Sequence, residues 1–481
     1  MKLLKTSIMA ILIAIPIYAG CSSIPTIPGK NGFEISVTNH DLNATALKDF
    51  VQLTVHEFFS NFDFIINAQT IKMSLGYESK DSWKIKLPSR FAYLNISYRK
   101  SGRSQSFFKY RYTYLIAEGD RLQCEIFKDF VRFTGDGSAK MNLQAQLFHL
   151  METPIDSTVP FEEYIVARND IYLRQLDLLD DNKKLISTDE LAYLRDQCYG
   201  LRNWDILRLL RFRLKFRKDD KSFQTKDVLA WLEAGDAKYI STQDIVAPYL
   251  MDYLYQKEKF TTELSVNGKQ LARKLLENIT SKFEPRISYH LKMLMLTHFY
   301  SYNEEVLQDF KETTPVVDDR QYAAIFKHFD SSFSKGKRAY DFAYPDTSGR
   351  INRLDDFKGK IVVIDFWFVG CIPCLELAKQ MKKIGHGLKG RDVVFITANV
   401  DQNQAKWKNA VKEGNYTHQG TINLFLGGMK SPILRHYNIT AYPRLIIIDK
   451  HGLIVTSTPV VPIDEASRAN FIDIIEQHLS K

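Results

Sequence analysis

The sequence has few cysteines for its length. Only five occur among 481 residues, although a chain of this size can form a hydrophobic core without covalent crosslinks. One core is unusual at this length, so two or three domains are expected. The composition, 45% hydrophobic and 25% charged, is typical of a soluble globular protein and argues against disorder and a membrane bundle. Two cysteines close together in such a chain therefore indicate chemistry rather than scaffolding.

The chain also lacks a strong excess of charge of one sign and lacks a clear internal repeat. Lys and Arg number 65 and Asp and Glu 56, which gives a formal net charge of +9. An imbalance this small fits a membrane surface or acidic partners, but it does not indicate nucleic-acid binding. No clean 34-residue period marks the middle of the chain, so a helical-repeat array is not predicted.

Long apolar runs are rare, and the one at the N-terminus has the features of an export signal. Lys2 and Lys5 precede an apolar stretch, 7–19, that is short for a membrane span. Cys21 follows "YAG" and resembles the lipid-modified cysteine of bacterial lipoproteins, although Tyr18 stands where Leu is usual. The alternatives are an exported protein without lipid and a buried N-terminal helix.

We therefore predict a lipoprotein signal peptide over residues 1–20 and a lipid anchor at Cys21. Cleavage there removes two lysines and lowers the formal net charge from +9 to +7. The predicted location is the cell envelope or periplasm, with the chain bound to a membrane through the lipid. Export to that compartment also makes nucleic acid an unexpected partner.

Hydrophobic periodicity divides the rest of the chain into four segments. Residues 21–32 are rich in Pro, Gly and Ser and predict a tether. Residues 33–140 carry short alternating runs, such as "WKIKL" and "AYLNISY", and predict a small β-rich domain. Residues 141–335 carry amphipathic patterns, such as "FEEYIVARNDIYLRQLDLL", and predict a helical domain. Strand and helix patterns alternate over residues 336–481, which predicts an α/β sheet, so the fold class is multidomain α+β.

Two further segments and two isolated cysteines have their own interpretation. "LRFRLKFR", Leu210 to Arg217, alternates apolar and basic residues like a strand although its surroundings are helical, and it is read chiefly as a solvated charged face. Ser331 to Phe342 is small and basic and is interpreted as a domain boundary. Cys124 and Cys198 lie in apolar patterns and are interpreted as buried core thiols.

"DFWFVGCIPC" places Cys371 and Cys374 where a buried strand ends and a helix begins. At a helix N-terminus, free N–H groups and the helix dipole stabilise a thiolate and lower the pKa of the thiol from about 8.5. We expect Cys371 to begin the helix with its sulfur exposed and to act as the nucleophile. Cys374 lies one turn further, on the same face, within reach to attack a mixed disulfide. Pro373 fits the first turn, where no N–H partner is needed.

Other uses of this cysteine pair are less well supported. A zinc site needs further ligands at similar spacing, and neither a second CxxC nor a His pair is nearby. Covalent haem attachment needs His directly after the second cysteine, where Leu375 stands. A structural disulfide is possible, but tight CxxC loops suit catalysis better. We therefore expect thiol-disulfide exchange with no metal and no cofactor.

Several ordered motifs within residues 336–481 resemble the thioredoxin-fold domain of the TlpA/ResA-like thiol-disulfide oxidoreductases. They are "DTSGRINRLDDFKGK" as a lead-in hairpin, "VVIDFWF" as the strand before the site, "GCIPC" as the dithiol, and "YNITAYPRLIIIDKHG" as the stretch with the cis-proline. The resemblance covers about 30% of the chain. It implies an exported or membrane-tethered enzyme that acts on protein thiols and disulfides and is recharged by an upstream reductant.

The resemblance also implies roles for individual residues. Asp365 stands six residues before Cys371, where thioredoxins have a buried acid, and would take the proton of Cys374. Pro443 would be cis, and the backbone of Tyr442 would pair with an extended substrate segment. Trp367 is expected as active-site wall or core, and Gly370 opens the surface beside the nucleophile.

The sequence departs from the family pattern at a few positions. Gly370 stands where Trp is frequent, and Leu377 and Lys379 stand where Glu and Pro are frequent. Arg444 replaces the usual Thr after the cis-proline and is expected to place a positive charge near the site. These differences leave the second proton donor and the partner preference open.

The leading functional prediction is an envelope thiol-disulfide oxidoreductase that reduces protein disulfides. A peroxidase of the peroxiredoxin group is an alternative, but it requires Thr or Ser where Phe368 stands. A binding or scaffold lipoprotein with a vestigial redox domain is the alternative outside enzymes. Turnover of a disulfide substrate distinguishes this last alternative from the enzyme.

Overall fold

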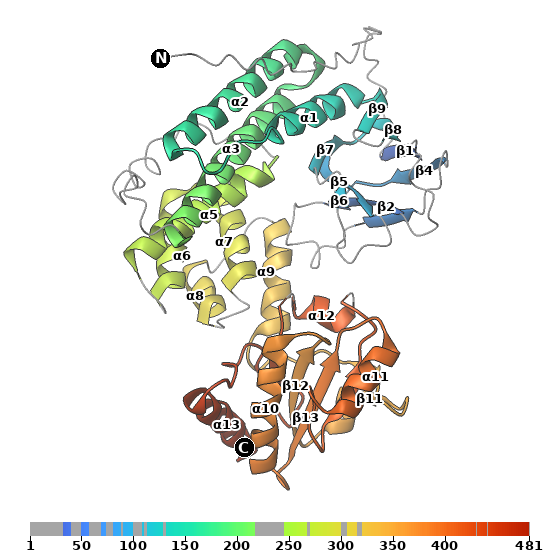
Figure 1. Ribbon diagram of the computed structural model, residues 1–481, viewed down its shortest axis with the longest axis vertical. Helices are drawn as coiled ribbons and strands as arrows, with labels where there is room; N and C mark the ends of the chain where they lie inside the picture. The colour runs from blue at the N-terminus through green and yellow to red at the C-terminus, as the bar shows by residue number, and fades with distance from the viewer. Residues whose placement is uncertain are drawn as a thin grey trace.

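The computed structural model has a mixed N-terminal part and a C-terminal α/β part below it, which meet at helix α9 (Arg320–Phe333) (Figure 1). The predicted multidomain α+β class is therefore confirmed. The structure describes residues 32–39, 50–56, 69–73, 80–87, 90–99, 108–109, 113–127, 131–216, 245–266, 270–299, 305–314, 320–429, 431–439 and 441–480. The predicted signal peptide, Cys21 and all of the tether except Gly32 lie outside these residues.

Two sheets in the N-terminal part share one apolar core. Their strand orders are β4-β1-β8-β9 and β3-β2-β5-β6, with β7 paired to β5. Phe33, Ile35 and Val37 of β1 are buried on one face and pack in one cluster with residues of both sheets, among them Leu94 and Cys124. The strands are β1 (Phe33–Asn39), β2 (Phe50–His56), β3 (Gln69–Met73), β4 (Lys80–Ile85), β5 (Phe91–Arg99), β6 (Phe108–Lys109), β7 (Thr113–Ala117), β8 (Arg121–Ile126) and β9 (Val131–Asp136).

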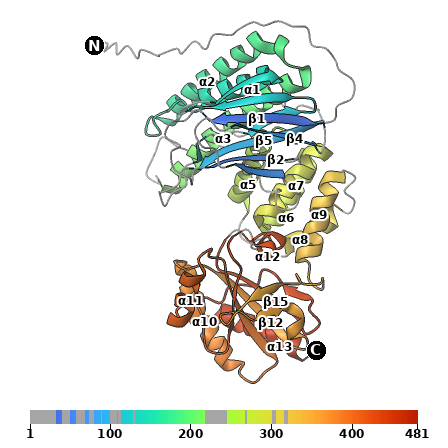
Figure 2. The same ribbon diagram turned by 90° about the vertical axis from the view of Figure 1, so that its right-hand side faces the viewer.

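Helices cover these sheets from two sides. Figure 2 shows α1 and α2 on one side of the strands and α5 and α7 on the other. Met141 and Phe148 of α1 enter the apolar core of the two sheets. The helices are α1 (Ser138–Met151), α2 (Phe161–Asn182), α3 (Thr188–Phe216), α5 (Pro248–Ser265), α6 (Gln270–Lys282), α7 (Pro285–Phe299) and α8 (Glu305–Thr313). None of the helices in the described part of the chain is both long and apolar enough to span a bilayer.

A buried ion triad joins the sheets to these helices. Lys140 Nζ of α1 lies 2.9 Å from Asp120 Oδ2, just before β8, and 2.8 Å from Glu190 Oε1 of α3. Lys140 is only 4% exposed, so its charge is balanced inside the protein by two carboxylates. The triad thereby fixes α1 between the sheet and α3.

The ambiguous segment from Leu210 is helical, not a strand. Residues up to Phe216 form the last two turns of α3. Leu210 and Arg213 face inward, and Arg213 Nη2 donates a hydrogen bond to Ser157 O at 2.7 Å. Helical periodicity explains the burial, because residues three apart share a face.

The C-terminal part has a five-stranded sheet in the order β14-β13-β12-β15-β16. The first three strands run parallel, and β15 and β16 are antiparallel to their neighbours. Side chains of α10 and α13 pack on one face of the sheet, and those of α12 pack on the other face. The elements are β10 (Ala343–Pro345), β11 (Ile351–Arg353), β12 (Ile361–Trp367), α10 (Ile372–Gly387), β13 (Val393–Asn399), α11 (Gln404–Glu413), β14 (Ile422–Phe425), α12 (Pro432–His436), β15 (Arg444–Ile448), β16 (Ile454–Thr456) and α13 (Glu465–Leu479).

The segment interpreted as a boundary is built into the C-terminal part. Residues up to Phe333 still belong to α9, and Phe333 is fully buried against Tyr437, with ring centroids 6.4 Å apart. Beyond it, Gly336 N donates to Ile454 O at 2.8 Å, and Ala339 N donates to the backbone of the β15–β16 turn at 2.9 Å. The chain that arrives from α9 thus runs along β16 at the edge of the sheet. The predicted limits at 140 and 335 stay predictions.

Candidate active site

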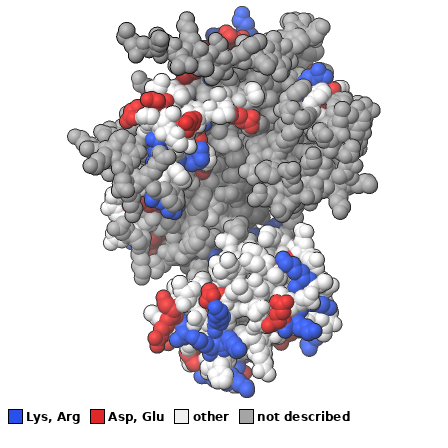
Figure 3. Space-filling model, viewed as in Figure 1, with Lys and Arg blue, Asp and Glu red and all other residues white. Residues whose placement is uncertain are grey.

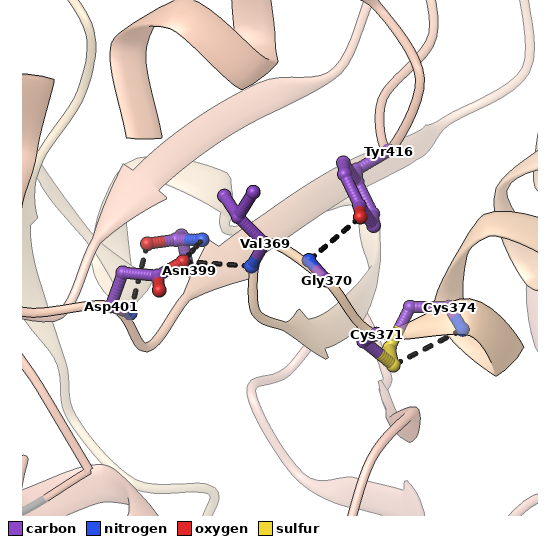
Figure 4. The surroundings of a disulfide bond; sticks show 7 residues. All are labelled: Val369, Gly370, Cys371, Cys374, Asn399, Asp401 and Tyr416. Carbon is purple, nitrogen blue, oxygen red and sulfur yellow. Dashed lines mark hydrogen bonds between the residues drawn. A yellow bond between two sulfur atoms is a disulfide. The ribbon is translucent and has the colours of Figure 1, made fainter. Parts of the chain in front are cut away.

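The dithiol lies between the end of β12 and the start of α10. Cys371 is the N-cap residue of α10, and its Sγ accepts a hydrogen bond from Cys374 N at 3.2 Å. The two sulfurs form a disulfide (Figure 4). Pro373 lies in the first turn of α10, as the spacing predicts. The structure therefore represents the oxidised form of the pair. Because the N–H of Cys374 in the first turn points at Sγ of Cys371, this end of the helix favours negative charge on that sulfur.

The expectation that the sulfur of Cys371 is exposed is wrong for this oxidised form. Cys371 is 3% exposed and Cys374 is 1% exposed. Both pack in one cluster with the aromatic residues Trp367, Trp407 and Tyr416, and the bond between the sulfurs covers part of each. Ile372, which follows the first cysteine, is instead 73% exposed.

Side chains from two other loops hold the loop that precedes Cys371. Val369 N donates to Asp401 Oδ2 at 2.8 Å, and Gly370 N donates to the Tyr416 hydroxyl at 2.8 Å. Asn399 fixes Asp401 in turn, since its Nδ2 donates to Asp401 Oδ2 at 2.9 Å (Figure 4). These three supporting residues are not predicted from the sequence. The only sequence signal is their position after a buried strand or helix on the same sheet, which is too weak to select them.

Gly370 owes its place in this loop to its backbone conformation. Its φ is 104°, a region that glycine enters without steric cost. A Cβ there would meet no atom within 4 Å, so space does not exclude a side chain, but the conformation disfavours one. The residue is exposed beside Cys371, in agreement with the expected open surface.

Asp365 is buried in the centre of the sheet. It pairs with Thr397 of β13 and Leu445 of β15 and is 4% exposed. Burial raises the pKa of its carboxyl to about 8. Among the described residues, none forms a hydrogen bond with Oδ1 of Asp365. Alternation along β12 puts its side chain on the face covered by α10, the helix that carries Cys374.

Trp367 and Tyr416 form one aromatic wall of the site. Their rings stack with centroids 4.5 Å apart and an interplanar angle of 13°. Trp367 is completely buried and shares an apolar cluster with both cysteines, as expected for wall or core. Tyr416 thus supports the site twice, through its ring and through the hydroxyl that holds Gly370.

The peptide bond between Tyr442 and Pro443 is cis. The half-buried ring of Tyr442 meets Phe368 edge to face at 5.5 Å, which places the cis-proline loop against the loop before the dithiol. Burial raises the pKa of the Tyr442 hydroxyl to about 12. The structure therefore brings Trp367, Gly370, both cysteines and this loop together.

Arg444 does not share a sheet face with Asp365. It is 9% exposed, and its antiparallel partner is Phe366, whose side chain lies in the core on the other face. Paired residues on neighbouring strands project to the same side. Arg444 therefore lies on the face opposite the acid, which corrects the expected positive charge on the dithiol side.

The other cysteines lie apart from this site. Cys124 is buried in β8 and Cys198 in α3, both are free thiols, and burial raises the pKa of each. They occupy different apolar clusters from the dithiol. Within the part of the chain that the structure describes, no group of three His, Cys, Asp or Glu residues is arranged to hold a metal ion.

Known proteins with a similar sequence identify the family to which this site belongs. Residues 334–472 match the family model described as Redoxin. Thiol-disulfide oxidoreductase ResA of Bacillus cereus is 30% identical over 139 residues, which span 28% of this chain and 78% of that protein. ResA of Bacillus thuringiensis subsp. konkukian is 31% identical over 120 residues, 25% of this chain and 66% of that protein.

The solved structures include a similar domain. The thioredoxin domain of a thiol-disulfide oxidoreductase from Bacteroides vulgatus is 26% identical, with 29% of this chain and 96% of that chain covered and a TM-score of 0.26. The similarity to the Bacillus cereus protein extends over more than two thirds of its length. This chain therefore belongs to the thiol-disulfide oxidoreductases, and its C-terminal part is the thioredoxin-like domain of that enzyme family.

Proposed function

We propose that this enzyme reduces disulfides of other proteins in the cell envelope through Cys371 and Cys374. The observation that carries the proposal is the N-cap position of Cys371, whose sulfur already accepts a hydrogen bond from Cys374 N at 3.2 Å. A thiolate at that position is stabilised by the helix end, which makes it the attacking sulfur.

The reaction has two exchange steps. In the first, the Cys371 thiolate attacks a substrate disulfide, forms a mixed disulfide, and releases one substrate sulfur as a thiolate. In the second, Cys374 gives its proton to the carboxylate of Asp365 and attacks Sγ of Cys371. The bond between Cys371 and the substrate breaks, the second substrate thiolate leaves, and the two cysteines form the disulfide of the present structure. An upstream dithiol reductant returns the pair to the reduced form.

The substrate is proposed to lie across the loops around the disulfide. Ile372 and Pro373 are exposed next to the first sulfur, and the backbone of Tyr442, before the cis-proline, is suited to pair with an extended segment. Figure 3 shows Lys and Arg interspersed with Asp and Glu on the face of the C-terminal part that this view presents.

Substitution of the second cysteine tests the mechanism. Cys374→Ser should attack a substrate but fail to release it, so that mixed disulfides accumulate and can be isolated under non-reducing conditions. Cys371→Ser is the matched control and should trap nothing. If Cys374→Ser accumulates no mixed disulfide while the wild type reduces the same substrate, the proposed order of attack is wrong.

The location is proposed from the N-terminal sequence. Lys2 and Lys5, the apolar stretch that follows, and Cys21 after "YAG" together support export and a lipid anchor. Cys21→Ser should abolish incorporation of a labelled fatty acid and release the enzyme from the membrane fraction. Unchanged labelling and fractionation would contradict the anchor while leaving the redox proposal intact.

A further inference from the structure

A small cavity lies under α10, between strands β12 and β13 and the segment 416–421. Its polar lining comes from Asp365, Thr397, Tyr416, His418 and Thr421, and apolar side chains of β12, β13 and α10 complete the wall. The space suffices for about one water molecule, and a buried water needs two to four polar partners. The cavity thus has both the size and the polar lining that hold a water.

Asp365 forms the inner end of this cavity. It is 4% exposed, it lines the cavity, and its Oδ1 has no hydrogen-bond partner among the described residues. A buried carboxyl oxygen without a partner is costly unless a water or another group satisfies it. The cavity supplies the space for such a water directly beside the carboxyl group.

His418 forms the outer end, and α10 is shaped to admit it. A Cβ at Gly385, inside α10, would lie 2.6 Å from Cε1 of His418, so the imidazole in its present position packs where a side chain on residue 385 would otherwise lie. Glycine weakens a helix interior relative to alanine, so this close packing has a cost. The ring also meets Phe395 edge to face at 5.6 Å, and the residue is only half-buried.

We propose that this cavity holds a water molecule and that the water and His418 together carry the proton between Asp365 and the solvent. The proposal rests on the proposed role of Asp365 as the base for Cys374. His418 acts through Asp365 and does not contact the sulfurs, so it is a positioning residue for the proton. No comparable route is needed for the first exchange step, in which Cys371 attacks as a thiolate.

The transfer balances in protons. Protonated Asp365 gives its proton to the cavity water as the water passes another to a ring nitrogen of neutral His418, which leaves a carboxylate, a water and an imidazolium. The imidazolium then releases its proton to bulk water. His418 Nδ1 lies 3.2 Å from Gln419 O, and a hydrogen on Nδ1 leaves Nε2 as the accepting atom.

Several charged and titratable groups among the described residues lie near this route. Burial lowers the pKa of His418, the hydrogen bond to Gln419 O partly opposes this, and Lys382 of α10 lowers the pKa further, so the neutral ring predominates at pH 7. Burial raises the pKa of Asp365 to about 8, so most of the carboxyl is protonated at pH 7 and must lose its proton before it can act as a base. Cys374 and Tyr416 are the titratable neighbours on α10 and the 416–421 segment, and Arg444 of β15 lies on the opposite sheet face.

The test measures the two exchange steps separately, by rapid mixing of the reduced full-length protein with a model disulfide between pH 6 and pH 9. His418→Phe keeps a ring against Phe395 but removes the nitrogens. At pH 7 it should slow resolution of the mixed disulfide on the order of tenfold, with the first attack unchanged. The deficit should shrink toward pH 9, because Asp365 is then ionised without the route. His451→Gly, an exposed histidine in the β15–β16 turn, is the control.

Chemical rescue separates proton transfer from packing. His418→Gly leaves a hole of imidazole size against Gly385, and added imidazole should restore resolution in this variant but not in His418→Phe. Resolution at the wild-type rate in both variants at pH 7 overturns the inference. A deficit that is equal at pH 7 and pH 9 and is not rescued by imidazole also overturns it. A wild-type protein that does not reduce the model disulfide counts against the proposed function itself and removes this inference with it.

Discussion

The N-terminal and C-terminal parts of the molecule treat a buried charge in opposite ways. In the N-terminal part, the buried ammonium of Lys140 lies within 2.9 Å of two carboxylates. In the C-terminal part, the buried carboxyl of Asp365 has an oxygen without a partner among the described residues, and its pKa rises to about 8. A buried charge that is paired with opposite charges holds structural elements together. A buried carboxyl group without such a partner instead keeps its proton up to a higher pH and can exchange it near neutral pH.

The cysteines follow the same division. Cys124 and Cys198 are free thiols in apolar clusters of the N-terminal part, and burial raises the pKa of both. Cys371 and Cys374 are equally buried but stand at a helix start and are bonded to each other. Burial alone therefore does not identify a reactive cysteine, whereas its position relative to a helix end does.

The largest expected effect separates these two kinds of cysteine. Cys371→Ser should abolish reduction of a model disulfide, because the attacking sulfur is gone. Cys124→Ser should leave the rate per folded molecule unchanged, since that thiol is buried away from the site. The measurement is the initial rate of disulfide reduction with excess reductant. Loss of activity in a folded Cys124→Ser variant would contradict the distinction between redox-active cysteines and core thiols.

The next effect tests the paired charge. Lys140→Met should lower the free energy of unfolding by about 3–5 kcal/mol, because it leaves the buried carboxylate of Asp120 and the partly buried carboxylate of Glu190 without their cation. Urea denaturation measures this loss, and Lys358→Met, which removes an exposed partner of Asp355, is the control with an expected loss below about 1 kcal/mol. The rate of disulfide reduction per folded molecule should not change. A stability loss no larger than that of the control would show that the triad contributes little.

A third effect concerns the junction between the two parts. A fragment of residues 320–481 should be more stable than one of residues 336–481 by about 2–3 kcal/mol, because only the longer one keeps the buried Phe333 of α9 against Tyr437. Thermal unfolding of the two fragments measures the difference. Equal stability would mean that α9 belongs with the helices before it.

The smallest effect concerns the buried carboxyl of Asp365 and is measured as a dependence of the unfolding free energy on pH. The folded pKa of Asp365 is raised to about 8, so its contribution to stability is fully present below the unfolded pKa of about 4 and is lost as the pH rises to 8. Between pH 6 and pH 7 the wild type should lose about 1 kcal/mol of unfolding free energy more than Asp365→Asn, which cannot ionise. Urea denaturation at both pH values provides the comparison. Parallel curves for the two proteins would show that Asp365 is not the group responsible.

The sequence predicts the C-terminal part far better than its supporting contacts. An apolar run followed by CxxC and a later Tyr-Pro pair place β12, the start of α10 and the cis-proline loop, because these follow from local patterns. Tyr416, Asp401 and His418 come from loops whose position depends on how distant elements pack. The segment from Leu210 was ambiguous for a related reason, since alternating apolar and basic residues fit either a strand or the two sides of a helix.

Burial is the other quantity that local patterns do not give. The position of Cys371 at a helix start predicts an exposed sulfur, yet aromatic side chains from three separate segments cover it. Arg444 follows the cis-proline in sequence, but strand alternation turns it to the far face of the sheet. Both outcomes depend on pairings between distant strands and helices.

The hydrogen bonds that align residues 336–339 with β16 also constrain how the C-terminal part can turn relative to α9. A redox domain on a loose peptide could turn in many directions to meet its partners. Here backbone hydrogen bonds of 2.8–2.9 Å attach residues 336–339 to the sheet. The buried side chain of Phe333 packs the preceding helix, α9, against the same part of the molecule. The junction is therefore not a flexible linker, and we expect α9 and the dithiol to move together as one rigid unit. A change in the orientation of the dithiol toward a partner protein would then require movement of the chain before α9, or movement of the partner.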